Sequence, residues 1–476
     1  MNYFAINEQY KTRTAVIDDA GTTLKYEDLY QLSYVFKEKI PTRSLVFSFC
    51  HNSAGSLAGY FAFLSNGIVP VLLDRNIDEE LAKNLLQVYQ PEFIYIPADR
   101  KESYPHFTCV HQQYDYCLMQ TNYGTSHALY PELALLLTTS GSTGSPKFVR
   151  QSYKNIQSNA ESIVEYLKID DTERPITTLP MNYTYGLSII NSHLLAGAVV
   201  LMTDKSLMER EFWEFFKSQE ATSFGGVPYT YEILKKLRFF RMDLPSLRTM
   251  TQAGGKLSPQ LHKEFAEYAK QQKKQFVVMY GQTEATARMA YLPYERSLEK
   301  YGSMGIAIPG GTFTLVDVNG QPITEPEVIG ELIYEGANVT LGYAESIEDL
   351  AKGDERQGRL VTGDMAKMDE DGYFYIVGRK KRFLKIYGNR VNLDEVERML
   401  KQKFPETDFA CGGKDDKLYV FLTTPEETLK EQVKKYLTEK TGLNHKAFHI
   451  KTVDEIPKNE AGKTLYIKLE EYYDEL

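Results

Sequence analysis

The chain has 476 residues, of which 42% are hydrophobic and 25% charged, the composition of an ordinary globular protein. Its 64 acidic and 55 basic side chains give a net charge of −9, which argues against sequence-independent binding to nucleic acid and against anionic membrane surfaces. Four cysteines in so long a chain are not a disulfide framework, and the first residues lack the basic and apolar regions of a signal peptide. We therefore expect a reducing compartment and a cytoplasmic location.

The first two thirds of the chain alternate helical and strand patterns, which indicates an α/β architecture. Residues 55–73 carry no charge, but Ser65–Gly67 and Pro70 interrupt the run. This predicts a buried helix, a turn and a buried strand, with no transmembrane segment. Apolar residues recur at helical spacing after Asn155, which is the expected N-cap, and Ala198–Met202 reads as a buried strand.

Further along, the pattern changes to hairpins and then to a compact tail. Asn319-Gly320 and Asp371-Gly372 each separate two strand-like runs, which is a strong signal for a tight hairpin. Asn392 is the expected cap of a helix in the tail. The predicted fold is a large, multi-subdomain α/β body with a β-rich part over residues 1–380, followed by a small α+β domain over residues 381–476.

The most informative segment is an apolar strand that runs into a loop of hydroxyls and glycines and ends in a lysine. Glycines let backbone N–H groups converge on an oxyanion, hydroxyls add donors, and the lysine adds charge. The Walker A spacing G-x-x-x-x-G-K-[ST] is absent. A flexible Ser/Gly linker is the alternative, although a linker is rarely preceded by a buried strand. The residues expected to hold phosphate are Thr139, Ser140, Gly141, Ser142, Thr143, Gly144 and Lys147.

Several segments together carry a resemblance to one enzyme superfamily. Thr139 to Lys147 have the form T-S-G-[ST]-T-G-x-P-K, and Tyr280 to Glu284 have the form Y-G-x-T-E. The other segments, in order, are Leu24–Leu29, Leu64–Asp74, Gly330–Tyr343, Leu360–Asp364, Gly378-Arg379 and Pro457–Lys463. This series, which covers nearly the whole chain, resembles the ATP-dependent, AMP-forming (adenylate-forming) enzymes: acyl-CoA synthetases, adenylation domains of nonribosomal peptide synthetases, and luciferases.

The resemblance implies a nucleotide site in the larger predicted domain. Tyr280 is expected to stack on adenine, Thr283 to contact the α-phosphate, and Glu284 to hold Mg²⁺. These roles are chemically reasonable because an aromatic face suits a purine and a hard oxygen ligand suits magnesium. Gly255 and Gly281 are expected to line the same site. Without this context, Glu284 would be interpreted as a solvated surface charge.

The resemblance also assigns roles to three residues nearer the end of the chain. Asp364 is expected to accept both ribose hydroxyls, since a carboxylate offers two oxygens to two donors. Arg379 is expected to contact the nucleotide, and Lys463 to be the catalyst of adenylation. The structural alternatives are a turn aspartate, a surface arginine and an exposed lysine in the tail.

A basic run joins the two predicted domains. By resemblance, Lys381 is the hinge, while Lys385 and Gly388 belong to a loop near the incoming pantetheine thiol. Composition alone would also allow a nucleic-acid patch here, which the acidic balance of the chain disfavours.

The acyl pocket is expected to include Tyr183, Tyr185 and Gly186. Tyr183 stands in the segment where amino-acid-activating members have an aspartate that pairs with the substrate ammonium. An α-amino acid is therefore less favoured, although another carboxylate can serve. The glycine pair in Gln252–Leu257 is shifted by one place from the arrangement that is commoner in the family. Gly255 therefore predicts a roomier acyl pocket.

Together these expectations describe a two-step ligase that uses ATP and Mg²⁺. A small-molecule carboxylic acid becomes an acyl-AMP with release of pyrophosphate, and a thiol of coenzyme A or of a separate carrier protein then takes the acyl group. The alternatives are a stand-alone amino-acid-adenylating enzyme for a carrier protein, an adenylate-forming oxygenase, a nucleotide-only transferase, and a non-catalytic nucleotide-binding homologue. The last is disfavoured because Glu284, Asp364, Arg379 and Lys463 occur together.

Overall fold

The structure, a computed structural model, describes residues 8–124, 127–138, 147–386, 389–414, 416–458 and 464–473. The chain divides into two compact units, which are described separately. Unit 1 comprises Met1–Phe313 and Tyr334–Leu360, and unit 2 comprises Thr314–Ile333 and Val361–Leu476. Within the described ranges, no helix is long and apolar enough to cross a membrane.

Unit 1 contains a nine-stranded sheet in the order β16-β15-β14-β13-β12-β10-β11-β1-β2. The six strands from β14 to β1 in this order run parallel, whereas β2, β15 and β16 pair antiparallel. The strands are β1 (Thr14–Asp18), β2 (Thr23–Lys25), β10 (Pro175–Ile176), β11 (Val200–Met202), β12 (Ser223–Gly226), β13 (Thr249–Gln252), β14 (Gln275–Tyr280), β15 (Ala290–Tyr291) and β16 (Ile306–Ala307). Parallel neighbours end at a common edge, and this edge carries the predicted site.

A second sheet of unit 1 has eight strands in the order β20-β9-β8-β4-β3-β5-β7-β6. They are β3 (Leu45–Cys50), β4 (Val69–Asp74), β5 (Phe93–Pro97), β6 (Thr108–Gln113), β7 (Tyr116–Gln120), β8 (Leu133–Thr138), β9 (Phe148–Ser152) and β20 (Gly342–Ala344). Strand β8 leads directly into the segment predicted to hold phosphate. The charge-free run at residues 55–73 forms most of a buried helix and then β4, which confirms the helix–turn–strand prediction.

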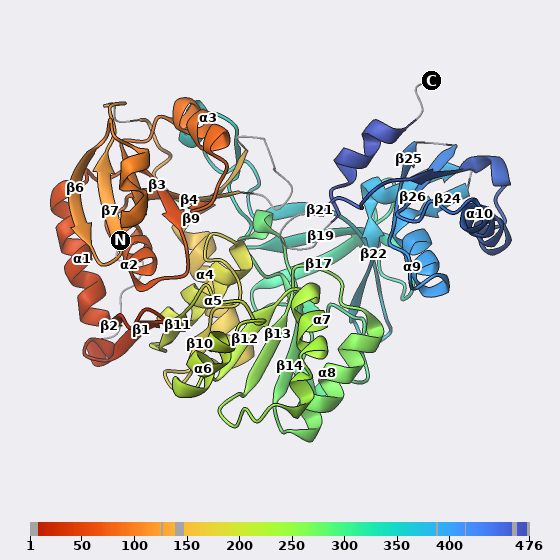
Figure 1. The fold of residues 1–476 in the computed structure, drawn as a ribbon, viewed down its shortest axis with the longest axis horizontal. Coiled ribbons are helices and arrows are strands. Elements are labelled where there is room, and N and C mark those ends of the chain that lie inside the picture. Colours follow the sequence, from red (N-terminus) through yellow and green to blue (C-terminus); the bar gives the residue numbers. More distant parts are fainter. Residues whose placement is uncertain are drawn as a thin grey trace. The chain divides into compact units, whose positions relative to one another are not determined.

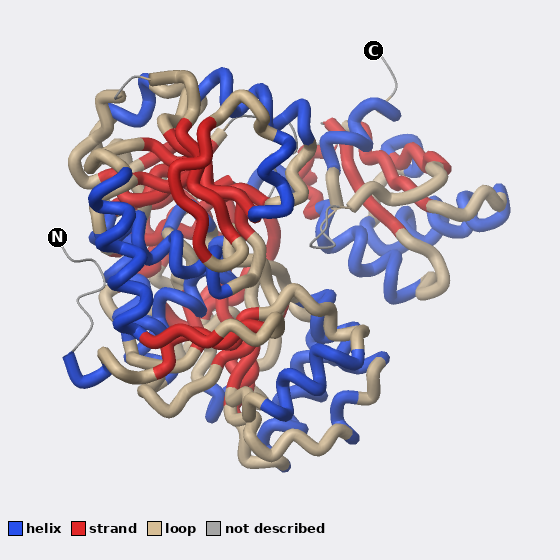
Figure 2. The backbone as a smooth tube through the Cα atoms, turned by 60° about the vertical axis from the view of Figure 1, so that its left-hand side comes forward, coloured by secondary structure: helices blue, strands red, loops and turns tan. Residues whose placement is uncertain are grey.

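Eight helices belong to unit 1 within the described ranges. They are α1 (Tyr26–Lys39), α2 (Ala54–Ser65), α3 (Glu79–Tyr89), α4 (Tyr153–Leu167), α5 (Thr184–Leu195), α6 (Arg210–Ser218), α7 (Pro228–Lys236) and α8 (Pro259–Gln271). Figure 1 shows α7 and α8 beside strands β12 to β14. In Figure 2 the strands of unit 1, drawn in red, lie between helices, drawn in blue. Helices on the faces of a mostly parallel sheet are the expected solution for burying such strands.

The start of α4 corrects one prediction. The N-cap is Ser152, and Asn155 is the third helical residue. The Ser152 hydroxyl accepts a hydrogen bond from the Asn155 backbone N–H at 3.1 Å, and the Asn155 side chain accepts one from the Ser152 N–H at 2.9 Å. This reciprocal capping box satisfies two backbone donors, so the helix begins three residues before the position predicted from its apolar spacing.

Unit 2 contains most of a five-stranded sheet in the order β18-β17-β19-β21-β22. Its strands are β17 (Gly311–Val316), β18 (Pro322–Ile323), β19 (Gly330–Gly336), β21 (Arg359–Met368) and β22 (Phe374–Arg379). The pairs β17–β18 and β21–β22 are antiparallel, which confirms both predicted hairpins.

The rest of unit 2 is a small α+β arrangement. Its elements are the hairpin β23 (Phe383–Ile386) with β24 (Asn389–Asn392), the sheet of β25 (Phe409–Lys414), β26 (Lys417–Leu422) and β27 (Phe448–Thr452), and the helices α9 (Leu393–Lys403) and α10 (Glu427–Thr441). The Asn392 side chain accepts a hydrogen bond from the backbone N–H of Asp394 at 2.9 Å and caps α9, as predicted. Buried side chains from both helices and the strands form one hydrophobic cluster.

Candidate functional site

Three parallel strands of the nine-stranded sheet end beside one another in unit 1. Strands β12, β13 and β14 are neighbours in parallel register and end at Gly226, Gln252 and Tyr280. Ligands bind at the carboxyl edge of such sheets. The topology therefore gathers at one edge two segments that are predicted to line a nucleotide site, one containing Gly255 and the other Tyr280 and Gly281.

Glycines allow these segments to pass close to their neighbours. Gly254 has φ +80°, and a Cβ there would lie 2.7 Å from the Tyr183 hydroxyl oxygen. A Cβ on Gly255, which is exposed, would lie 3.0 Å from Pro228. A Cβ on Gly281 would overlap the carbonyl group of Ala287, so any other residue would push the chain after β14 out of place. The glycine turn thus lies directly against a residue predicted to line the acyl pocket.

Tyr280 and Thr283 follow each other across the end of β14. Tyr280 is half-buried, and its hydroxyl accepts a hydrogen bond from Gln282 Nε2 at 3.2 Å. Thr283 is buried at the start of the 3-10 helix Thr283–Ala285. Two hydrogen bonds hold the following segment, since the Thr286 carbonyl accepts from the Thr184 hydroxyl and from Gln151 Nε2.

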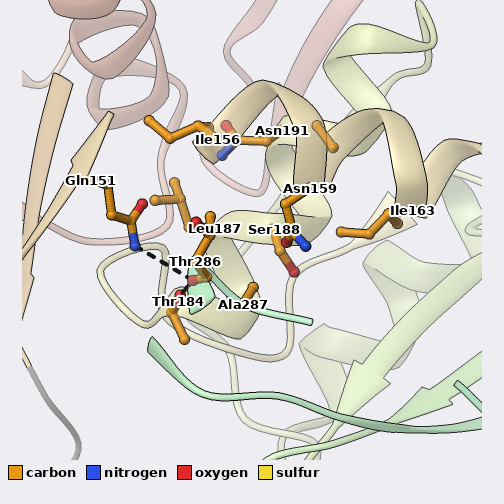
Figure 3. Close-up of a pocket in the computed structure, with 11 residues that line it drawn as sticks. Gln151, Ile156, Asn159, Ile163, Thr184, Leu187, Ser188, Asn191, Thr286 and Ala287 are labelled. Carbon is orange, nitrogen blue, oxygen red and sulfur yellow. Dashed lines mark hydrogen bonds between the residues drawn. The ribbon is translucent and has the colours of Figure 1, made fainter. Parts of the chain in front are cut away.

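These bonds border a small cavity between α4 and α5 (Figure 3). Its volume is about 10 Å³, room for about one water molecule. Its lining is mixed, with Ile156, Ile163 and Leu187 on the apolar side and Asn159, Ser188 and Asn191 on the polar side. A cavity of this size does not accommodate a substrate.

Glu284 lies in a cluster with one aromatic ring and two cations. Tyr343 donates a hydrogen bond from its hydroxyl to Glu284 Oε1 at 2.7 Å. The Lys147 Nζ atom lies 3.9 Å from the centre of the Tyr343 ring, and the Arg356 Cζ atom lies 4.6 Å from it. Arg356 also donates to the Glu284 backbone carbonyl at 3.2 Å, and Lys147 lies 3.4 Å from a carboxylate oxygen of Glu345.

The electrostatics of this cluster suit a polyphosphate accompanied by a metal cation. Burial, and then the Glu284 carboxylate, raise the pKa of Tyr343 to about 12, so its hydroxyl remains a donor. No group of three or more potential metal ligands occurs among the described residues. A single carboxylate nevertheless fits Mg²⁺, which proteins commonly bind through one or two carboxylates plus substrate phosphates. Arg356 lies outside every segment that carries the family resemblance, so the sequence alone does not predict its place in this cluster.

The predicted acyl pocket coincides with a separate buried cluster. The Tyr185 hydroxyl hydrogen-bonds the Thr251 hydroxyl at 2.8 Å, and burial raises the pKa of Tyr183. A Cβ on Gly186 would overlap the carbonyl oxygen of Pro180, which brings the start of α5 close to the preceding loop. The buried members of the cluster are Leu179, Tyr185, Ile189, Val227, Ala253, Val277 and Met279.

In unit 2, Asp364 and Arg379 face each other across the β21–β22 hairpin. They are cross-strand partners, and Arg379 Nε lies 2.8 Å from Asp364 Oδ1. Asp364 is 2% exposed, whereas more than half of the Arg379 side chain is exposed. Lys381, the predicted hinge, is exposed in the 3-10 helix Lys380–Arg382, directly after β22. The structure therefore brings together two predicted nucleotide-binding residues.

The remaining predicted site residues have no described geometry. Thr139, Ser140, Gly141, Ser142, Thr143, Gly144, Gly388 and Lys463 lie outside the described residues. Lys385 lies in β23, but its side chain is likewise outside the description. Their roles stay predictions.

A family model described as "AMP-binding enzyme" matches residues 4–344. Peroxisomal OPC-8:0-CoA ligase 1 of Arabidopsis thaliana is 30% identical over 350 residues, which cover 70% of this chain and 63% of that protein. Medium-chain fatty-acid–CoA ligase of Escherichia coli K12 is 28% identical over 344 residues, 70% of this chain and 60% of that protein. The chain thus spans about three fifths of the length of these curated relatives.

Solved structures resemble the chain over almost its whole length. The o-succinylbenzoate CoA synthetase of Bacillus subtilis, in complex with its acyl-adenylate intermediate, has a TM-score of 0.78 at 22% identity and covers 98% of this chain and 97% of its own. ATP-bound MatB of Rhodopseudomonas palustris has a TM-score of 0.78 at 21% identity and covers 99% of this chain and 98% of its own. At these identities the similarity concerns the fold, and it confirms the predicted α/β class.

Proposed function

Because the chain belongs to the AMP-binding enzyme family, we propose that it activates a carboxylic acid with ATP and passes the acyl group to a thiol. The observation that carries this proposal is the cluster of Glu284, Tyr343, Lys147 and Arg356. It places a carboxylate and two cations beside the carboxyl edge of a parallel sheet, where a nucleotide triphosphate is expected to bind. The similarity to curated relatives named as CoA ligases also supports it.

In the first step, the substrate carboxylate attacks the α-phosphorus of ATP, an acyl–phosphate bond forms and pyrophosphate leaves. Lys147 and Arg356 stabilise charge on the phosphates, and Lys463 does so at the reacting phosphorus. Such transfers depend on positioning and electrostatic stabilisation rather than on covalent chemistry of the protein. Asp364 and Tyr280 hold the ribose and the adenine. We assign Thr283 to the α-phosphate.

Glu284 is the residue that would hold Mg²⁺, together with phosphate oxygens of the nucleotide. When bound, the metal supplies positive charge that neutralises the phosphates. The Tyr343 hydroxyl orients the Glu284 carboxylate through its hydrogen bond, which leaves the second carboxylate oxygen for the metal.

In the second step, the sulfur of coenzyme A or of a separate carrier protein attacks the acyl carbon, and AMP leaves with the electron pair. We propose that residues 381–476 rotate about Lys381 between the two steps, which withdraws Lys463 and presents the loop of Lys385 and Gly388. Conformational gating of this kind accounts for steps that need two arrangements of one site. A variant Lys381→Pro should retain acyl-adenylate formation and lose most of the thioester formation.

We also propose a cytoplasmic location. All four cysteines are free thiols, and Cys50, Cys117 and Cys411 are buried. Free, buried thiols are typical of a reducing compartment. Separation of a cell lysate into soluble and membrane fractions, followed by detection of this protein, tests the location.

The experiment for the first step is carboxylate-dependent exchange of pyrophosphate into ATP. A panel of aliphatic, aromatic and amino acids should contain at least one acid that supports exchange by the wild type. Lys463→Ala should reduce that exchange by about 10²-fold or more, since it removes a charge that acts on the transition state. Lys468→Ala removes an exposed lysine from the same tail and is the matched control.

Two outcomes would contradict the proposal: no acid of the panel supports exchange, or Lys463→Ala exchanges as fast as Lys468→Ala. Adding coenzyme A or a phosphopantetheinyl carrier protein to the positive reaction then identifies the thiol. Exchange with an α-amino acid together with transfer to a carrier protein would favour the stand-alone adenylating enzyme.

A further inference from the structure

Arg288 is a buried cation in the wall of the predicted acyl pocket. It lies four residues after Glu284 and is 2% exposed. Its guanidinium carbon lies 5.2 Å from the centre of the Tyr185 ring. It also contacts Met279, another member of the buried cluster that forms this pocket. None of the segments recognised in the sequence includes Arg288.

The hydrogen-bond partners of Arg288 are all neutral. Nε donates to the Ser188 hydroxyl at 3.1 Å, and Nη1 donates to the Tyr166 hydroxyl at 3.1 Å and to the Met279 sulfur at 3.3 Å. Among the described residues, no carboxylate lies within ion-pair distance of the guanidinium. No described residue of any kind accepts a hydrogen bond from Nη2. A buried charge is costly unless an opposite charge accompanies it.

Neighbouring groups do not supply the missing negative charge. Burial raises the pKa of both Tyr166 and Tyr185, so these phenols stay neutral near Arg288. Burial, and to a lesser extent the charge of Arg288, lower the pKa of His193 to about 4, so this imidazole stays neutral as well. The cationic character of Arg288 is therefore uncompensated by the side chains around it.

We infer that the acid activated by this enzyme carries a second carboxylate, and that this group pairs with Arg288 in the acyl pocket. The inference rests on the function proposed above and names its substrate class, a dicarboxylic acid. A guanidinium suits this role because hydrogen bonds between two charged groups are strong, and the N–H groups of Nη2 have no acceptor among the described residues. The second carboxylate takes no part in bond making, so it remains intact in the acyl-adenylate.

The same arrangement also has a purely structural explanation. Arg288 would then have a structural role only: its contacts with Tyr166, Ser188 and Met279 would link α4, α5 and β14. The two explanations differ in one respect. If Arg288 is only structural, the enzyme has no preference among acids, whereas if Arg288 binds substrate, the enzyme discriminates by the charge at the far end of the acid.

The test uses pairs of acids of equal length and shape. Each pair is a dicarboxylic acid and the monocarboxylic acid in which a methyl group replaces the second carboxylate, in aliphatic and aromatic series. In pyrophosphate exchange, the wild type should prefer the dicarboxylic member of the best pair by about 10²-fold in kcat/KM, the effect expected for a buried charge pair. Arg288→Met should abolish or invert the preference, and Arg288→Lys should keep part of it.

A second readout does not depend on catalysis. The best dicarboxylic acid should raise the melting temperature of the wild type in the absence of ATP, and this shift should vanish in Arg288→Met. The melting temperature of each variant without ligand reports whether it is folded. If Arg288→Met fails to fold, the wild-type preference and Arg288→Lys still decide the question.

The inference is overturned if the wild type exchanges both members of every pair equally or prefers the monocarboxylic acids. It is also overturned if Arg288→Met slows exchange with both members to the same extent, which would assign Arg288 to the reacting carboxylate or to the scaffold. If no acid supports exchange, the proposed ligase function fails. The inference is then decided by the melting shift alone and fails with it if dicarboxylic acids produce none.

Discussion

Two buried arginines of unit 1 differ in their hydrogen-bond and ion-pair partners, and this difference indicates a different role for each charge. Arg150 is 0% exposed, and Arg288 is 2% exposed. Arg150 pairs with the Glu355 carboxylate, and its remaining donors reach backbone carbonyls of Leu341, Tyr343, Lys352 and Gly353. Arg288 has no carboxylate among its described neighbours. The first charge is fully used within the protein, whereas the second is available to a ligand.

The largest expected effect is on stability at Arg150. Arg150→Met removes five hydrogen bonds, one of them within the ion pair with Glu355, which should lower the free energy of unfolding by about 3 kcal/mol or more. Arg288→Met is the matched control. It removes an uncompensated charge and should change stability by less than about 1 kcal/mol in either direction. Urea denaturation of both variants checks this contrast, and equal losses would remove the distinction between the two arginines.

A third arginine extends the comparison to unit 2. Arg379 pairs with Asp364, but it is largely exposed, so losing the pair should cost little stability. Asp364→Asn should instead raise the KM for ATP by about ten- to a hundredfold, because a carboxylate binds two hydroxyls more strongly than an amide does. Asp371→Asn, in the turn of the same hairpin, is the control. An unchanged KM in Asp364→Asn would remove Asp364 from the nucleotide site.

The environment of Arg288 also predicts a pH dependence. The folded-state pKa of His193 is about 4, below the ordinary value of 6.5. The unfolded chain therefore takes up a proton near pH 6.5 that the folded chain accepts only near pH 4, and stability falls as the pH drops through this window. At pH 5 the loss is about 2 kcal/mol. His193→Gln should remove this loss, as measured by urea denaturation at pH 7 and pH 5.

His262 provides a control for that measurement. Burial lowers its pKa to about 4 as well, while its Nε2 atom hydrogen-bonds the Ser297 hydroxyl and its Nδ1 atom accepts a hydrogen bond from the Gly302 N–H. His262→Gln should therefore flatten the pH profile to a similar extent. Arg288→Met should raise the pKa of His193 alone, and equal shifts in both histidines would show that the charge of Arg288 does not act locally.

The smallest predicted effect concerns Tyr343, whose ring contacts Arg356. Tyr343→Phe keeps the ring between Lys147 and Arg356 but removes the hydrogen bond to Glu284. The expected loss is about 1 kcal/mol, which corresponds to roughly a fivefold higher Mg²⁺ concentration for half-maximal exchange. Tyr34→Phe, at an exposed position, is the control. A change in maximal rate without a change in the Mg²⁺ requirement would contradict the orienting role of Tyr343.

Sequence patterns predicted the family and much of the local structure. The Y-G-x-T-E segment and Leu360–Asp364 are identifiable because glycines and acidic residues stand at fixed positions, and the family match over residues 4–344 confirms the resemblance. The two hairpins follow from Asn-Gly and Asp-Gly turns. The capping box at α4 was misassigned because apolar spacing marks the face of a helix better than its first residue.

Other features were invisible in the sequence for physical reasons. The pairing of Asp364 with Arg379 depends on the register of the hairpin, which contains an irregularity between Met365 and Ala366. Arg288 and Arg356 resemble surface residues in the sequence, because arginine is rarely fully buried. Only tertiary packing shows that Arg288 contacts residues of the predicted acyl pocket and that Arg356 contacts Glu284, the residue proposed to hold Mg²⁺.

The partnership of Arg150 with distant carbonyls has a consequence for biosynthesis. Strand β20 completes one edge of the eight-stranded sheet by pairing with β9, and the Arg150 Nε atom bonds a carbonyl 193 residues later. A ribosome adds about 5–20 residues per second, so roughly 10–40 seconds pass between the synthesis of β9 and that of its partner β20. During that interval a nascent chain exposes an unpaired strand edge, the kind of surface that chaperones shield.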